Sequence, residues 1–252
     1  MKAEKIVKEI ADTEAKQASS VVQEFSRFAH QYNTYNMIQA KVATTLISKL
    51  PSQSYKNIID IGSGSGEVYK NLQKQKVLLE NFVALDSAQT MLAIHPDNKQ
   101  ITKICTNFND RDFTDHIPKR DYDVLLSSSA LQWSTDLVYT MRELSLLSST
   151  FYGALFTSGT FKTLHQIAGV SSPIYSEDIV RDVMNQFYKD VQFELHHYSL
   201  EFNSTRDMFK YIKQSGVSSG ERKLNYTQTK ALMENYPLNY LEFEVLFIEA
   251  KN

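Results

Sequence analysis

A glycine-rich segment, followed at a distance by a single acid, is the part of this sequence best suited to bind a ligand. The segment runs Asp60-Ile61-Gly62-Ser63-Gly64-Ser65-Gly66, and Asp86 stands 20 residues beyond Gly66. Glycines let the backbone approach a ligand without Cβ atoms in the way, and a helix that begins near Gly66 directs free N–H groups toward it. An acid at the end of the next strand can bind both hydroxyls of a ribose. The pattern therefore predicts a nucleoside site.

The spacing of the glycines separates two classes of nucleotide ligand. A dinucleotide-binding turn needs glycines at positions 62, 64 and 67, but position 67 is Glu67. A carboxylate there suits a pyrophosphate badly, whereas glycines at 62, 64 and 66 suit S-adenosylmethionine, which carries no phosphate. We expect this cofactor, with S-adenosylhomocysteine as its product. A nicotinamide oxidoreductase, a non-catalytic cofactor sensor, and a structural turn in which Asp86 caps the next helix remain as alternatives.

Residues at the ends of the other expected strands should face the same crevice, because parallel strands share one carboxyl edge of a sheet. Asn107 and Phe108 could contact the edge and face of an adenine, and the small residues Ser127, Ser128 and Ser129 leave room for the methionine part and the transferred methyl. Trp133, the only tryptophan, belongs either to this pocket or to the core. The cofactor-binding residues predicted along this edge are Asp60, Gly62, Ser63, Gly64, Gly66, Asp86, Ser87, Met91, Asn107, Phe108 and Ser127.

Strands and helices alternate along the part of the chain that carries these residues. Short apolar runs separated by helical segments form βαβ units, which build a parallel sheet with helices on both faces. Five strands are expected at 55–61, 82–86, 101–105, 122–126 and 152–157, with helices at 89–94 and 136–147. The predicted fold class is a Rossmann-like, doubly wound, mostly parallel α/β sheet.

The two ends of the chain depart from this alternation. Residues 1–50 have apolar positions at helical spacing and Pro51 stops the run, which predicts an N-terminal helical cap. After helices at 160–168 and 177–188, two late strands at 191–202 and 240–250 bring the total to seven, with helices at 204–214 and 227–235 between them. We expect a core of 51–202 and 239–252, with 203–238 as an inserted helical lid.

The composition is that of an ordinary globular protein, with 252 residues, 42% hydrophobic and 22% charged. A net charge of -2 gives the whole molecule no attraction for nucleic acid. The single cysteine, Cys105, excludes an internal disulfide, and we expect it to be a small buried residue. The six histidines lack metal-ligand spacing, so no metal is expected. The absence of an apolar span and of a secretory leader favours the cytoplasm over a membrane.

Four further segments give the chain a resemblance to a known family. The strand-and-loop set resembles the class I methyltransferases, and the whole chain is similar to the malonyl-acyl-carrier-protein O-methyltransferases of biotin synthesis. The segments are Phe25-Ser26-Arg27 with Tyr32 and Gln39, Ser129-Ala130-Leu131-Gln132-Trp133, Phe156-Thr157-Ser158 with Leu164-His165, and Phe209 to Gly216. Asn107 departs from the family, which commonly has an aspartate there.

The resemblance implies an acceptor and a mechanism. The acceptor would be the free carboxylate of malonyl phosphopantetheine on an acyl carrier protein, or of malonyl-coenzyme A, and the product its methyl ester. Such a carboxylate is ionised at neutral pH, so no catalytic base is expected. The enzyme would supply alignment and a site dry enough to strip water from the carboxylate. The alternative is another small carboxylic acid, such as trans-aconitate.

Basic residues in the expected lid could recognise such an acceptor. Arg206, Lys210 and Lys213 share one helical face, and the 204–223 segment is locally basic. This face either binds the acidic carrier or its malonyl carboxylate, or is a solvated surface. The resemblance places Lys213 closest to the acceptor, with Trp133 and Arg27 as further substrate candidates, and lets Tyr32 and Gln39 close over the methionine end of the cofactor.

Overall fold

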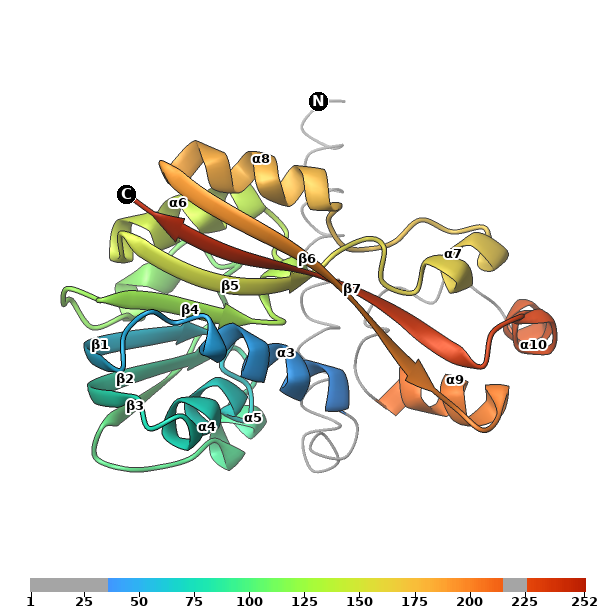
Figure 1. Cartoon of the computed structure of the whole chain (residues 1–252), viewed down its shortest axis with the longest axis horizontal. Helices are drawn as coiled ribbons and strands as arrows, with labels where there is room; N and C mark the ends of the chain where they lie inside the picture. Colours follow the sequence, from blue (N-terminus) through green and yellow to red (C-terminus); the bar gives the residue numbers. More distant parts are fainter. Residues whose placement is uncertain (1–35, 215–225) are drawn as a thin grey trace, which may run out of the picture.

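A seven-stranded sheet forms the centre of the molecule (Figure 1). The computed structural model describes residues 36–214 and 226–252, and side chains within these ranges except at 213–214 and 226–227. The strands, in chain order, are β1 Ser54–Ile61, β2 Leu78–Asp86, β3 Ile101–Cys105, β4 Val124–Ser128, β5 Thr150–Phe156, β6 Asp190–Glu201 and β7 Tyr240–Lys251. Their order across the sheet is β3-β2-β1-β4-β5-β7-β6. The strands β1 to β5 pair in parallel and β7 runs antiparallel to β5 and β6, which confirms the predicted fold class.

Helices cover both faces of the sheet because its central strands are apolar on both sides. Ile58 and Ile59 are neighbours on β1, yet they belong to two different hydrophobic cores. The α-helices are α3 Met37–Ser48, α4 Glu67–Lys74, α5 Gln89–Ile94, α6 Leu137–Leu147, α7 Lys162–Ala168, α8 Glu177–Phe187, α9 Thr205–Gln214 and α10 Tyr226–Asn235, with short 3-10 helices η2 Phe113–His116 and η3 Leu131–Trp133. The first core takes side chains from α3 and α4, and the second from α6 and α8. Among the described residues, no helix combines the length and apolar character that a membrane crossing requires.

The strands β6 and β7 extend beyond the rest of the sheet and carry α9 and α10 at their far end (Figure 1). Buried side chains of these helices, such as Met208 and Leu232, share the first core with Leu241 and Phe243 of β7. The segment expected as an inserted lid therefore packs on the β6–β7 extension. Its role as a lid over 203–238, and that of 1–50 as a cap, remain predictions.

Two local expectations need correction. The strand β2 begins at Leu78, four residues before the expected 82, because alternate residues of its first half are exposed and give no continuous apolar run. Cys105 is exposed instead of buried, because it ends β3, the edge strand of the sheet, where no neighbouring strand covers it.

Candidate functional site

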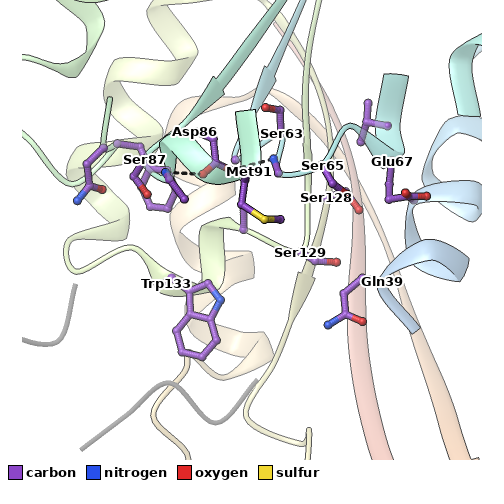
Figure 2. Close-up of a pocket in the computed structure, with 18 of the residues that line it drawn as sticks. Gln39, Ser63, Ser65, Glu67, Asp86, Ser87, Met91, Ser128, Ser129 and Trp133 are labelled. Carbon is purple, nitrogen blue, oxygen red and sulfur yellow. Dashed lines mark hydrogen bonds between the residues drawn. The ribbon is translucent and has the colours of Figure 1, made fainter. Parts of the chain in front are cut away.

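A cavity opens at the carboxyl ends of the central strands (Figure 2). It encloses about 900 Å³, its open mouth included, which is the size range of small-molecule sites. Its walls come from the turn after β1, the end of β2, the loop after β3 and the loop after β4. The predicted residues that line it are Gly62, Ser63, Gly64, Asp86, Ser87, Met91, Asn107, Phe108, Gln39 and Trp133. The structure thus brings together ten residues that the sequence proposed for one site, and their role in binding stays a prediction.

The glycine turn closes tightly over the end of β2. The N–H groups of Gly62 and Ser63 both donate to the carbonyl oxygen of Leu85, at 2.8 and 2.9 Å. Gly62 has a φ of +73°, a left-handed conformation that side chains disfavour. A Cβ at Gly62 would in addition overlap the Cβ of Ala130 from the loop after β4. Gly62 is therefore required both by its conformation and by the close approach of a second cavity wall.

Asp86 joins the turn to the cavity. Its Oδ2 accepts a hydrogen bond from the Gly64 N–H at 2.8 Å, and its Oδ1 accepts one from the Ala88 N–H at 2.8 Å (Figure 2). Burial raises the pKa of this carboxyl, and the backbone N–H bonds oppose that rise. Asp86 therefore also does what the alternative of a purely structural turn requires, since it accepts from the N–H of Ala88 at the start of α5. Each oxygen retains a second lone pair, so the carboxylate can hold a ribose diol as well.

Asp60 lies behind the turn and does not line the cavity. Its side chain is fully buried, and within the described part of the chain neither carboxyl oxygen has a hydrogen-bond partner. Burial, and next the nearby charge of Asp86, raise its pKa well above the ordinary value. Asp60 is not one of the residues that line the cavity, and its contribution to cofactor binding stays a prediction. A buried acid without a partner is unusual, and a cationic ligand close by would stabilise its charged form.

Two other predicted residues also lie outside the cavity wall. A Cβ at Gly66 would come within 2.6 Å of Pro96 Cδ and 2.8 Å of His95 Cδ2, so this glycine serves packing on the far side of the turn. The Ser127 hydroxyl donates to the carbonyl oxygen of Ile61 at 2.8 Å, which uses it to hold β4 against β1. The strand β4 runs to Ser128, two residues beyond its expected end. Of the three serines predicted there, Ser128 and Ser129 line the cavity and Ser127 does not.

Several polar atoms in the cavity wall have no hydrogen-bond partner among the residues that the structure describes. They are the side-chain oxygens of Gln39, Ser63, Ser65, Ser128 and Ser129. Buried polar atoms are normally paired, so this concentration points to a polar ligand. Ser129 also adopts a left-handed φ of +59°, a strained conformation of the kind found at functional sites.

The charge of the wall fits a cation. Among the described residues that line the cavity, those with a charged side chain are Glu67 and Asp86, both acids. S-adenosylmethionine carries a sulfonium and an ammonium group, two positive charges beside its ribose. Unpartnered oxygens, an acidic wall and a glycine turn without Cβ atoms are the features that such a group requires, so the residues present fit it.

Other predicted residues are separate from this cavity or lie outside the described part of the chain. Arg206 and Lys210 are exposed on α9 and do not line the cavity. The backbone of Lys213 belongs to α9, but its side chain is not among those described. Arg27 and Tyr32 lie outside the described residues. The wall also contains Asn109, which the sequence did not single out although it stands two residues beyond Asn107 in the same loop.

We expect Asp60→Asn to stabilise the cofactor-free protein at neutral pH. The carboxyl of the unfolded chain loses its proton near pH 4, whereas burial and the nearby charge of Asp86 raise the pKa of Asp60 well above that in the folded state. The free energy of unfolding therefore falls as the pH rises from about 4 toward the raised pKa. An amide does not titrate, so the variant lacks this loss. Thermal unfolding should give a gain in Tm at pH 7 that shrinks toward pH 4, and an equal difference in Tm at both pH values would contradict the assignment.

Known proteins are similar in sequence to the part of the chain that lines the cavity and have the same fold. Residues 59–147 match the family of methyltransferase domains. The malonyl-[acyl-carrier protein] O-methyltransferase of Bacillus cytotoxicus is 24% identical over 235 residues, which cover 82% of this chain and 79% of that protein. A protein solved in complex with the Haloferax volcanii Trm112 methyltransferase activator superposes with a TM-score of 0.60 at 15% identity, over 92% of this chain and 97% of that one. The plantazolicin methyltransferase BpumL, solved with S-adenosylhomocysteine, has a TM-score of 0.52 at 15% identity, over 98% and 99% of the two chains.

Proposed function

Because the chain is an S-adenosylmethionine-dependent methyltransferase with the class I fold, we propose that its acceptor is the free carboxylate of a malonyl thioester. The thiol carrier would be an acyl carrier protein or coenzyme A. The observation that carries the proposal is the extent of the similarity to the Bacillus cytotoxicus protein, which covers 82% of this chain. The similarity therefore reaches beyond the part of the chain, 59–147, that matches the methyltransferase domain.

The described cavity wall is compatible with an acceptor that is already ionised. It contains no histidine, lysine, tyrosine or cysteine, the usual bases of proton abstraction, within the described ranges. Its two acids are otherwise engaged: Glu67 pairs with Lys70 at 2.8 Å, and Asp86 holds the glycine turn. A malonyl carboxylate needs no base, because it is ionised at neutral pH.

The chain's own residues would then bind, orient and keep the site dry. The cofactor supplies a methyl group on a positive sulfur, which a carboxylate oxygen can take without any proton transfer. Gly62, Gly64 and Asp86 would hold the nucleoside, and the apolar surfaces of Met91, Phe108 and Trp133 would exclude water from the acceptor.

A cation to select the acceptor carboxylate would come from outside the described cavity wall. Arg27 and Lys213 remain the proposed candidates, with Arg206 and Lys210 exposed on α9 as a surface for an acidic carrier. The cap at 1–50 and the lid at 203–238 remain part of this proposal.

The test is the transfer of labelled methyl groups from S-adenosylmethionine to a matched set of acceptors. We expect base-labile label on malonyl carrier protein or malonyl-coenzyme A, and none on the acetyl thioesters, which lack the free carboxylate but keep the carrier. Label on trans-aconitate alone would move the function to free polycarboxylates. Label on none of these acceptors, from protein shown to bind S-adenosylhomocysteine, would refute the proposal.

A further inference from the structure

The indole of Trp133 lines the cavity although its residue does not end a strand. It stands on η3, in a segment we call the Trp133 loop, residues 129–136 between β4 and α6. A facing segment, the Asn109 loop, comprises residues 106–112 between β3 and η2. Both loops contribute to the cavity wall, so the contacts between them determine its shape.

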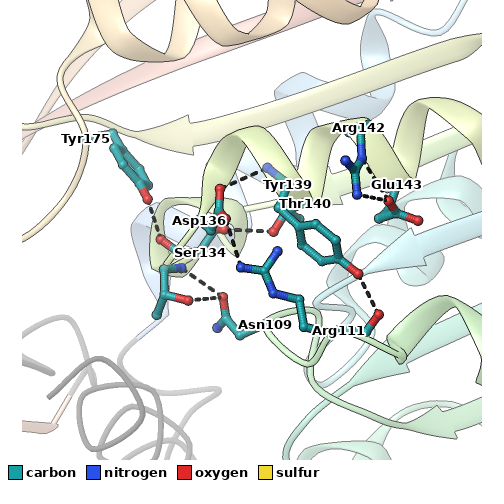
Figure 3. A network of polar contacts seen from close by, with 10 residues as sticks. Asn109, Arg111, Ser134, Asp136, Tyr139, Thr140, Arg142, Glu143 and Tyr175 are labelled. Carbon is teal, nitrogen blue, oxygen red and sulfur yellow. Dashed lines mark hydrogen bonds and ion pairs between the residues drawn. The ribbon is translucent and has the colours of Figure 1, made fainter. Parts of the chain in front are cut away.

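One side chain connects the two loops at the cavity (Figure 3). The Oδ1 of Asn109 accepts hydrogen bonds from the N–H of Thr135 at 2.8 Å and from its hydroxyl at 3.2 Å. The Nδ2 of Asn109 donates to the carbonyl oxygen of Trp133 at 3.3 Å. The amide thereby holds the backbone at Trp133 and at Thr135. An isosteric apolar side chain offers none of these contacts.

The backbone of Asn109 is itself held in place. Its N–H donates to the Oδ1 of Asn107 at 3.0 Å, a turn in which a side chain replaces a backbone acceptor. Asn107 therefore has a structural task beside its predicted contact with adenine. The two asparagines act in series, the first orienting the second and the second holding the Trp133 loop.

Contacts farther from the cavity hold the remainder of the Trp133 loop. The Tyr175 hydroxyl donates to the carbonyl oxygen of Ser134 at 2.7 Å, and Arg111 pairs with Asp136 at 3.1 Å (Figure 3). The side chains of Arg111 and Asp136 are 68% and 46% exposed. Ion pairs of such exposure contribute little in water. Asn109 is thus the connection between the loops that lies at the cavity wall itself.

We infer that Asn109 is a positioning residue, which sets the indole of Trp133 in the cavity and so controls how tightly the cofactor is held. The inference rests on the proposed use of this cavity for S-adenosylmethionine. It does not depend on the acceptor.

The intrinsic fluorescence of the protein tests this inference directly, because Trp133 is the only tryptophan. We expect Asn109→Leu to shift the emission to longer wavelength, to increase quenching by acrylamide, and to weaken S-adenosylhomocysteine binding about tenfold. Asn109→Asp keeps the oxygen that accepts from Thr135 but loses the Nδ2 donor to the Trp133 carbonyl, so it should shift the emission and weaken binding in the same direction as Asn109→Leu, to a smaller extent. Asn235→Ala is the control, since Asn235 is exposed on α10 and donates only to its own helix at Ala231.

Each outcome decides a different point. Wild-type emission, quenching and affinity in Asn109→Leu would overturn the positioning role. If the wild-type protein does not bind S-adenosylhomocysteine, the proposed cofactor site is refuted. Acrylamide quenching of the ligand-free variants would still test whether Asn109 holds the Trp133 loop. If far-UV circular dichroism shows that Asn109→Leu fails to fold, Asn109→Asp decides, because it lacks the donor to the Trp133 carbonyl. The inference then requires its emission to shift to longer wavelength, and emission and quenching identical to the wild type would overturn it.

Discussion

Gly62→Ala should abolish most cofactor binding while leaving the protein folded. An alanine at φ +73° is strained, and its Cβ would overlap the Cβ of Ala130. Relief of the overlap requires the turn after β1 or the loop after β4 to move, and both are walls of the cavity. We expect the affinity for S-adenosylhomocysteine to fall on the order of a hundredfold, because small displacements of binding groups have large effects. Isothermal titration calorimetry measures this affinity.

A matched glycine separates the strain from the overlap. Gly169, at the end of α7, has a similar φ of +64°, but a Cβ there would meet nothing within 4 Å. Gly169→Ala should therefore lower the Tm slightly and leave cofactor affinity unchanged. Adding Ala130→Gly to Gly62→Ala should recover part of the lost affinity, since it removes the overlap and leaves the strain. No recovery in the double variant would show that the conformation of the turn, and not its approach to Ala130, is decisive.

The sequence predicted the sheet best where a strand is buried on both faces. Ile58 and Ile59 on β1, or Leu125 and Leu126 on β4, face opposite cores, and such strands appear as continuous apolar runs. The first half of β2 does not, because Leu78 and Glu80 are exposed where that strand extends past the central helices. Its start at Leu78 depends on pairing with β1, which apolar patterning does not encode.

Residues of the cavity wall could be predicted to within one position where their place follows from the end of a strand. A strand end places Asp86 in the cavity, but the register of β4 decides whether Ser127 or Ser128 faces it. A one-residue difference sends a side chain to the other face of a sheet. Asn109 could not be found from the sequence, because its importance comes from Thr135, a residue 26 positions away in a different loop.

The position of Asp60 follows the same reasoning. Its place before the glycine turn suggested contact with the ligand, but its side chain is buried and is not part of the cavity wall. An influence through charge remains, because the Asp86 carboxylate is close enough to raise its pKa. A cationic ligand would act on both acids together, which is why the two carboxyls should be tested by separate substitutions.

Asp86→Asn should lower cofactor affinity on the order of a hundredfold, through two effects on one side chain. The amide has one oxygen, so it can accept from the Gly64 N–H or from the Ala88 N–H, and its NH₂ must face the other donor. It also lacks the charge that makes hydrogen bonds to a ribose diol strong. Calorimetry with S-adenosylhomocysteine and with its 2′-deoxyribose analogue separates these effects. The wild type should discriminate between the two ligands by about tenfold, and the variant much less.

Asp123 provides the control, because it performs the same structural task at the opposite edge of the sheet. Its Oδ2 accepts from the backbone N–H groups of Lys56 and Asn57, at 2.5 and 2.8 Å, where β1 begins. Asp123→Asn should lower the Tm without any change in ligand affinity. If both variants bound S-adenosylhomocysteine as the wild type does, Asp86 would be a structural acid like Asp123. The nucleoside would then have to be held by other groups of the cavity. If Asp86 contacts the sugar, affinity for S-adenosylhomocysteine should fall in Asp86→Asn and not in Asp123→Asn. Asp86→Asn should also lose the preference for S-adenosylhomocysteine over its 2′-deoxyribose analogue.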